Sequence, residues 1–332
     1  MNNTPLFFAP VFQERIWGGN RLREQFGYDI PSERTGECWA ISAHPNGQTT
    51  VINGPFQGKM LGELWNDHPE LFGHFPADRF PLLTKILDAN ADLSVQVHPS
   101  DEYARTYEHG ELGKTECWYI IDCKEGAELI YGHHAKTKEE LRQMMEEGQW
   151  HELLRKIPIR PGDFFYVPSG TVHALCEGTL VLETQQSSDT TYRMYDYDRV
   201  DEEGNKRELH LDKALDVVTV PHVDVYYEPR VIQTTGAKIT TFVQNEYFTV
   251  QKWDIEHEWV VEQTDRFLLV SVLEGKGDLC TAQETYPLKK GDHFLIPYSF
   301  DCFTIQGQLQ CIVSSPPREN NVFSIHMTTK VR

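Results

Sequence analysis

The sequence predicts a mainly β protein in which a few α-helices decorate two related β units. Short apolar and aromatic runs bounded by Gly, Pro, Asn and Asp recur along the chain, and many short strands favour an antiparallel sandwich or barrel. Apolar residues at helical spacing are confined to a few stretches. One strand–turn–strand segment also recurs later in the chain, which indicates an internal repeat.

The expected strands follow one another closely. In chain order they lie in ECWAISAHPNG (37–47), LSVQVHP (93–99), ECWYIIDCKEGAELIYG (116–132), DFFYVPSG (163–170), TVHALCEGTLVLETQQ (171–186), KITTFVQNEYFTVQKWDI (238–255), FLLVSVLEGKGDL (267–279) and HFLIPYS (293–299). Helical patterns are fewer. One runs from Met60 to Gly73, a second begins after Ser100 as an N-cap, and a third covers 136–157 as one helix or as two broken near Gly148.

The internal repeat divides the chain. RPGDFFYVPSGTVHAL (160–175) aligns with KKGDHFLIPYSFDCFTI (289–305). We therefore predict an N-terminal extension plus a metal-binding domain over 1–235, and a C-terminal degenerate domain over 236–332. His173 corresponds to Cys302, so we expect the second unit to lack whatever His173 does.

The overall composition narrows the classes of function. The 332 residues carry 50 acidic and 31 basic side chains, a net charge of -19 that disfavours nucleic-acid and anionic-membrane partners. No apolar run approaches the roughly 18 to 20 residues that cross a bilayer. The start shows no leader pattern, and the seven cysteines form no CxxC pair. We expect a cytoplasmic protein with reduced thiols, either a monomer or a weak homo-oligomer.

A candidate metal site follows from the spacing of polar residues on the expected strands. Gln96 and His98 are two apart, so their side chains share one face of a strand. Glu116 opens the next strand, with Lys114 two residues before it, and His173 follows a Pro-Ser-Gly turn. Two imidazoles and a carboxylate, optionally with an amide oxygen, suit one Zn²⁺ with an open position. The alternative for His173 is a hydrogen-bonded core histidine.

Two further basic residues are candidates for the same site. Arg193 follows directly on the His173 hairpin, and a guanidinium there could bind an oxyanion or stabilise developing negative charge. The alternative is an ion pair with a loop aspartate. Lys85 lies in the apolar run PLLTKILDA (81–89), where it could pair with a carboxylate, bind a substrate anion or act as a base.

Two resemblances combine these features. Gly162, Pro168, Gly170 and His173 match a cupin signature, which implies two jelly-roll β-barrels. More specifically, the chain resembles the short bacterial form of type I mannose-6-phosphate isomerase. The resembling motifs are RIWGGNRL (15–22), TGECWAISAHPNG (35–47), LLTKIL (82–87), LSVQVHP (93–99), GKTECWYI (113–120), PGDFFYVPSGTVHAL (161–175) and ETQQSSDTTYRMYDYDR (183–199).

The resemblance implies a zinc-dependent isomerase that interconverts mannose 6-phosphate and fructose 6-phosphate through a cis-enediol or enediolate. It also implies that His98, Glu116 and His173 hold zinc, with Gln96 as the fourth ligand. Arg193, Lys85 and Lys114 match active-site positions of the family.

The chemistry of the residues leaves two alternatives open. Two histidines and a carboxylate can also hold Fe²⁺ in a cupin oxygenase. A sugar-binding cupin without catalysis is the other alternative. It gives no reason for three basic residues to accompany the metal ligands.

Overall fold

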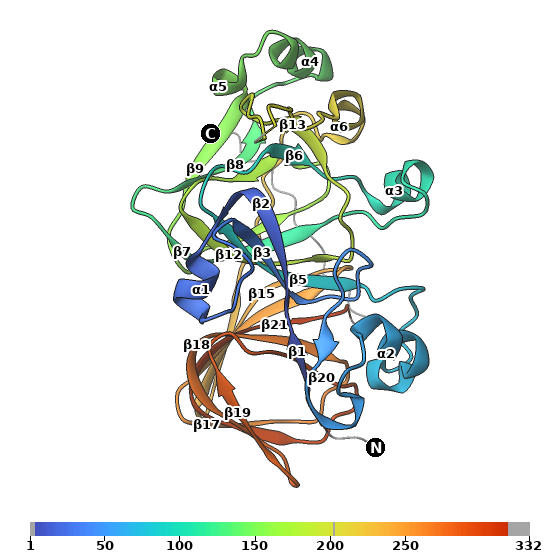
Figure 1. Ribbon diagram of the computed structural model, residues 1–332, viewed down its shortest axis with the longest axis vertical. Helices are drawn as coiled ribbons and strands as arrows, with labels where there is room; N and C mark the ends of the chain where they lie inside the picture. The colour runs from blue at the N-terminus through green and yellow to red at the C-terminus, as the bar shows by residue number, and fades with distance from the viewer. Residues whose placement is uncertain (1–3, 202, 318–332) are drawn as a thin grey trace.

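The computed structural model describes residues 4–201 and 203–317. Figure 1 shows two β bodies stacked along the long axis, the first built mainly from the N-terminal part of the chain and the second mainly from the orange and red C-terminal part. The prediction of a mainly β protein is confirmed. No helix in the described ranges is long and apolar enough to cross a membrane. All seven cysteines are free thiols.

The first body contains two sheets. In spatial order, the six-stranded sheet consists of β10 (Phe164–Val167), β7 (Glu116–Cys123), β12 (Thr179–Gln186), β5 (Leu82–Ala89), β3 (Thr35–Ile41) and β2 (Val11–Gly19). The five-stranded sheet consists of β13 (Tyr192–Tyr195), β6 (Val95–Val97), β11 (His173–Leu175), β8 (Glu128–His133) and β9 (Leu154–Pro158). Trp118 and Val181 of the first sheet and Leu129 and Leu175 of the second share one buried cluster, so the two sheets pack face to face.

The second body is a ten-stranded sheet. Its main path is β14 (Arg230–Thr234), β15 (Ala237–Gln244), β16 (Thr249–Ile255), β21 (Phe303–Ser315), β18 (Leu268–Cys280), β20 (His293–Ile296), β1 (Leu6–Ala9) and β4 (Thr50–Val51). Two more strands join it, β17 (Glu258–Val261) on β21 and β19 (Thr285–Lys289) on β18. The first strand of the chain thus completes the C-terminal sheet, with Leu6 opposite Leu295.

The pairing leaves both ends of each described sheet open. β2 and β10 each have a single neighbour in the six-stranded sheet, and β9 and β13 are edges of the five-stranded one. Two closed jelly-roll barrels are therefore not confirmed. The predicted repeat has a local counterpart, because Gly162 and Gly291 both adopt φ +92 just before β10 and β20. The exposed Cys302 immediately precedes β21, whereas His173 begins β11.

The helices are short and lie outside the sheets (Figure 1). They are α1 (Arg21–Phe26), α2 (Leu61–Asp67), α3 (Asp101–Tyr107), α4 (Lys138–Glu146), α5 (Trp150–Leu153) and α6 (Leu211–Val217), with 3₁₀ turns η1 (Gly54–Phe56) and η2 (Pro69–Phe72). Ser100 caps α3 as predicted, because its Oγ accepts a hydrogen bond from Tyr103 N. The break at Gly148 is also confirmed, with φ +69.

One helix prediction is wrong at its C-terminal end. Residues 154–158 form β9 instead of continuing the helix, because they pair with β8 and place Ile157 opposite Leu129. That pairing supplies interstrand hydrogen bonds and a partly buried position for Ile157, and so overrides the local helical pattern. Helices α1 and α6 were not predicted.

Candidate metal centre and pocket

Alternation along the inner strands aims polar side chains between the two sheets of the first body. On β7, Glu116 and Trp118 face inward while Cys117 and Tyr119 pack in the core on the other side. On β6, Val95 and Val97 pack beneath the helices, which leaves the opposite face to Gln96. Strand β11 begins with His173, directly opposite Gln96.

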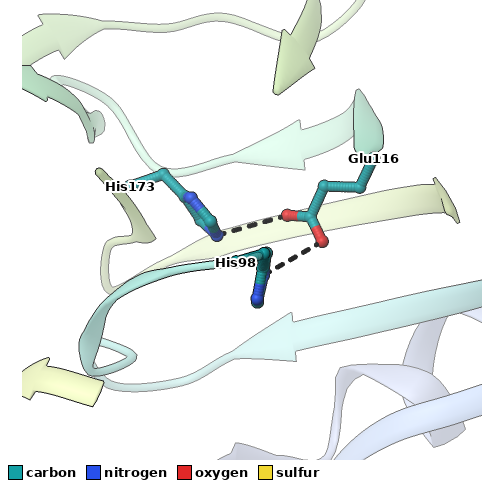
Figure 2. Close-up of side chains that lie close together, drawn as sticks. All are labelled: His98, Glu116 and His173. Carbon is teal, nitrogen blue, oxygen red and sulfur yellow. Dashed lines mark ion pairs between the residues drawn. The ribbon is translucent and has the colours of Figure 1, made fainter. Parts of the chain in front are cut away.

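Three of the predicted ligands converge. The ligand atoms of His98, Glu116 and His173 lie within 4.8 Å of one another, and Figure 2 shows the three side chains pointing toward a common centre. Glu116 Oε2 is 3.4 Å from His98 Nε2, and Glu116 Oε1 is 3.4 Å from His173 Nε2. All three side chains are at most 1% exposed. Buried groups of this kind are paired with one another or bind a cation.

Backbone carbonyls fix the tautomer of both imidazoles. His98 Nδ1 lies 2.9 Å from Thr190 O, and His173 Nδ1 lies 2.8 Å from Thr171 O. A carbonyl oxygen only accepts hydrogen bonds, so each Nδ1 carries the proton and each Nε2 presents a lone pair to Glu116. Metal-binding histidines are typically oriented by a partner of this kind.

The electrostatics favour neutral histidines beside an ionised carboxylate. Burial and the nearby Lys114 charge lower the pKa of His98 to about 3. Burial would raise the pKa of Glu116, but Lys114 and His98 lower it well below its usual value. Lys114 Nζ lies 3.0 Å from Glu116 Oε2 and 3.2 Å from His98 Nε2. These are the protonation states that metal binding requires.

The hydrogen bonds of this group are incomplete in a way that fits a cation. His173 Nε2 and both oxygens of Glu116 are buried and make no hydrogen bond, although one of those oxygens forms the ion pair with Lys114. Uncompensated buried acceptors cost about 1–3 kcal/mol each. A divalent cation would satisfy all three acceptors at once, so the residues present fit a metal ion.

A cavity of about 330 Å³ opens beside this group. Four of the predicted site residues line it, namely Lys85, Gln96, Lys114 and Arg193. Gln96 is paired in register with His173 on one side and Arg193 on the other, so the cavity wall connects the three-residue group to β13. The geometry therefore places four of the seven predicted site residues on the cavity wall, and the other three form the buried group that contacts Lys114 of that wall.

Lys85 lies in a registered row across the six-stranded sheet. Trp39, Lys85, Glu183 and Trp118 are successive cross-strand partners. Lys85 Nζ is 3.7 Å from Glu37 Oε2 and 3.9 Å from Glu183 Oε1, and it lies 4.7 Å from the centre of the Trp39 ring. Among the three roles left open for this lysine, the contacts show carboxylate pairing.

The two carboxylates beside Lys85 have opposite pKa shifts. Burial and the charge of Glu116 raise the pKa of Glu183 to about 7, against the lowering effect of Lys114 and Lys85. Burial works in the same direction on Glu37, but Lys85, Arg15 and a hydrogen bond from Trp39 lower its pKa to about 2. Pairs of titratable groups with separated pKa values are typical of acid–base sites.

Sequence reasoning missed part of the cavity lining. The missed charged residues are Arg15, Glu37, Glu183, Asp189 and Arg207. One signal was available, because the tripeptide Glu-Cys-Trp occurs at both 37–39 and 116–118. Trp39 donates to Glu37 and Trp118 donates to Glu183, each through its indole N–H. For Arg207, 14 residues beyond Arg193 in a loop, the strand pattern carried no signal.

Comparisons with known proteins identify the family. The family model "Phosphomannose isomerase type I, catalytic domain" matches residues 6–120, and "Mannose-6-phosphate isomerase, cupin domain" matches residues 238–316. Mannose-6-phosphate isomerase ManA of Bacillus subtilis is 58% identical over 314 residues, covering 95% of this chain and 99% of its own. The Streptococcus mutans enzyme is 54% identical over 310 residues, covering 93% and 98%.

A solved structure agrees with these matches. The crystal structure of mannose 6-phosphate isomerase from Bacillus subtilis is 60% identical, with a TM-score of 0.92. The match covers 94% of this chain and 99% of that chain.

Proposed function

The chain belongs to the type I phosphomannose isomerase family and acts on mannose 6-phosphate, and from that premise we propose a zinc-dependent aldose–ketose isomerisation in the cavity beside His98, Glu116 and His173. Gln96 is proposed as the fourth protein ligand. One observation carries the proposal: two imidazole Nε2 atoms and a carboxylate, all buried, converge beside a cavity, and His173 Nε2 and both oxygens of Glu116 make no hydrogen bond. We also propose that the reaction takes place in the cytoplasm.

The reaction moves a carbonyl from C1 to C2 of the sugar. A proton leaves C2 and a cis-enediolate forms. The hydroxyl proton then passes from O2 to O1, and a proton is added at C1. The unfavourable feature is the negative charge on oxygen, so positive groups that are fixed before the reaction lower the barrier. A bound zinc ion supplies a Lewis acid that does this without redox chemistry.

The protein's own residues supply the remaining parts. Arg193 is proposed to place its guanidinium next to the oxygen that becomes negative. Lys114 adds a second positive charge beside the metal ligands, because the Glu116 carboxylate raises its pKa despite its burial. Both residues line the cavity together with Gln96.

The proton-transfer group is proposed to be Glu183, positioned by Lys85. A carboxyl group with a pKa of about 7 can both accept and return a proton near neutral pH. Glu183 Oε2 accepts the Trp118 indole N–H at 2.9 Å, which holds the carboxylate toward the cavity. Lys85 lies between the carboxylates of Glu37 and Glu183, and its proposed role is to orient Glu183 instead of taking the proton.

The decisive experiment is a coupled assay with mannose 6-phosphate before chelation, after chelation and after zinc is restored. We expect activity to disappear and return together with one bound zinc per chain, measured by elemental analysis. Absence of turnover with every metal tested would leave a sugar-binding protein. An oxygenase would instead contain iron and consume O₂, whereas we expect the same isomerisation rate under anaerobic conditions.

A further inference from the structure

Two arginines lie together on the cavity wall formed by β13 and the segment that follows it. Arg193 belongs to β13, and Arg207 comes from the segment that returns past this strand. The return is fixed by two hydrogen bonds, from His210 N to Arg193 O at 2.7 Å and from Arg193 N to His210 Nδ1 at 3.1 Å. We call Arg193 and Arg207 the arginine pair.

The arginine pair carries more positive charge than its neighbours neutralise. Asp196 is 5% exposed and accepts from Arg207 through Nε at 2.8 Å and Nη2 at 2.5 Å. The same carboxylate also accepts from Arg199 at 2.5 Å. One buried carboxylate thus serves two guanidiniums while Arg193 lies beside them. Burial and the charge of Arg207 lower the pKa of Arg193, as expected for neighbouring like charges.

Both members of the pair keep donors that the described protein atoms do not use. Arg193 gives one bond, from Nη1 to Glu208 O at 2.7 Å, and its Nε is buried without a partner. Arg207 binds Asp196 through Nε and Nη2, and no hydrogen bond from its Nη1 to the described residues is found. Planar forks of N–H donors match the oxygens of a phosphate group, so this arrangement suits a tetrahedral anion.

The other basic groups lining the cavity have close carboxylate partners. Lys114 pairs with Glu116, and Lys85 lies between Glu37 and Glu183. Arg15 binds Glu37 with Nε and Nη2 and donates from Nη1 to Glu14 O. Arg207 also pairs with a carboxylate, but it shares Asp196 with Arg199, and no ion pair of Arg193 with a described carboxylate is found. Among the described cavity-lining cations, the arginine pair therefore keeps the largest excess of positive charge.

The pair lies at a suitable position relative to the metal ligands. Across the five-stranded sheet, His173 on β11 is opposite Gln96 on β6, and Gln96 is opposite Arg193 on β13. Neighbouring strands are about 4.8 Å apart, so Arg193 is separated from the His173 position by two strand spacings. Arg207 is attached beyond β13, on the side of Asp196. A hexose 6-phosphate likewise carries its carbonyl group at one end of the carbon chain and its phosphate at the other. With the carbonyl at the metal ligands, the phosphate would lie on the side of Arg207.

We propose that Arg207, held in place by Asp196, forms the phosphate subsite, while Arg193 keeps its proposed place beside the oxygen that becomes negative. Arg207 is then the residue that distinguishes a phosphorylated sugar from the free sugar. The inference rests on the proposed function and adds the location of its anionic end. In a chain of net charge -19, such a local excess of positive charge also opposes the general repulsion of an anionic substrate.

The test compares Arg207→Gln with Arg199→Gln in the zinc-loaded enzyme. Both substitutions remove a partner of Asp196, but Arg199 does not line the cavity. For Arg207→Gln we expect KM for mannose 6-phosphate to rise about 10- to 100-fold, the loss that follows removal of a charged hydrogen bond. We expect inhibition by inorganic phosphate to weaken similarly, with unchanged zinc content. Arg207→Lys should recover part of the affinity, and Arg199→Gln should keep a KM close to that of the wild type.

Each contrary outcome has one meaning. An unchanged KM in Arg207→Gln overturns the assignment of the subsite. Equal increases in the Arg199 and Arg207 variants would show that the effect acts through Asp196 and the fold, which also overturns it. If the wild type does not isomerise mannose 6-phosphate at all, the proposed function fails instead. Stabilisation of the wild type by inorganic phosphate in thermal unfolding, lost in Arg207→Gln, would then still support an anion site.

Discussion

Single backbone carbonyls determine much of the chemistry of the candidate metal centre. Thr190 O and Thr171 O each hold an imidazole with its Nε2 lone pair toward Glu116, so the ligand atoms need no rotation before a cation binds. Both carbonyls belong to segments adjoining the sheets, and the tautomers therefore depend on correct packing of β11 and β13. The fold thus orients both imidazoles before a metal ion binds, and a metal ion would fill the position between them and Glu116.

The role of Arg193 can be separated from metal binding. We expect Arg193→Ala to retain one zinc per chain and to lose turnover by about 100- to 1,000-fold, the usual range when a donor to a developing oxyanion is removed. Elemental analysis and kcat on the same preparation give both values. Arg193→Lys is the matched control and should recover part of the rate. Full activity in Arg193→Ala would exclude charge stabilisation by this residue.

Glu37 should make stability depend on acid pH. Its folded pKa is about 2, below the ordinary value of 4.5, because the effects of Lys85 and Arg15 exceed that of burial. The stabilisation is therefore fully present above about pH 4.5 and is lost as the pH falls toward 2, by on the order of 3 kcal/mol. Urea unfolding at several pH values should show a shallower loss in Glu37→Gln than in the wild type. The exposed Glu125→Gln should keep the wild-type slope, and equal slopes in all three proteins would contradict the assignment.

At the scale of elements, the Pro-Ser-Gly turn between β10 and β11 holds the backbone of the proposed metal ligand His98 in place. Gly170 adopts φ +84, its N–H donates to His98 O at 2.9 Å, and its carbonyl accepts from Thr219 N at 2.9 Å. A Cβ at this position would lie 2.6 Å from Thr219 Oγ1 and 2.9 Å from Val217 O. The turn therefore requires glycine for two reasons, its backbone conformation and its close contacts.

Gly170→Ala should destabilise the protein and weaken zinc binding together. The left-handed conformation costs about 1–2 kcal/mol for a residue with a Cβ, and the clash adds to it. Gly162→Ala is the control, because Gly162 has φ +92 and a Cβ added there would meet no described atom within 4 Å. We expect thermal unfolding to show a small loss in the control and a larger one in Gly170→Ala, with zinc affinity reduced only in the latter. Equal losses of stability would contradict a role for the close contacts.

How far the sequence predicts these elements depends on whether the signal is local. The period-two pattern around Val95 and Val97 placed Gln96 on the opposite face, and Ser100 was readable as a cap. Strand β9 could not be predicted from the sequence, because its strand conformation depends on pairing with β8. Glu183 was not predicted for the same reason. It lies next to Lys85 only because of the register in which β12 pairs with β5.

At the scale of the whole molecule, the two β bodies share a core. Phe164 of the six-stranded sheet stacks on Phe242 of the ten-stranded sheet, with ring centroids 4.6 Å apart and planes 5° from parallel. Thr184 Oγ1 and Ser314 Oγ, 2.8 Å apart, are hydrogen-bonded partners across the same boundary. Residues from both bodies belong to one buried cluster. The division into 1–235 and 236–332 remains a proposal about which residues form the two related units. The shared core gives no reason to expect that each unit folds on its own.

The shared core predicts that the two bodies unfold together. Calorimetry should show a single unfolding transition. Added zinc should raise the temperature of the whole transition, because the ion binds only the folded chain. Phe303 lies deep in the core of the second body. Phe303→Ala should move the same transition to lower temperature and reduce the free energy of unfolding by about 3–5 kcal/mol. Phe242→Ala at the boundary should do likewise and should also weaken the response to zinc if it loosens the six-stranded sheet. Two separate transitions, one moved by zinc and the other by Phe303→Ala, would instead show that the bodies are energetically independent despite their common core.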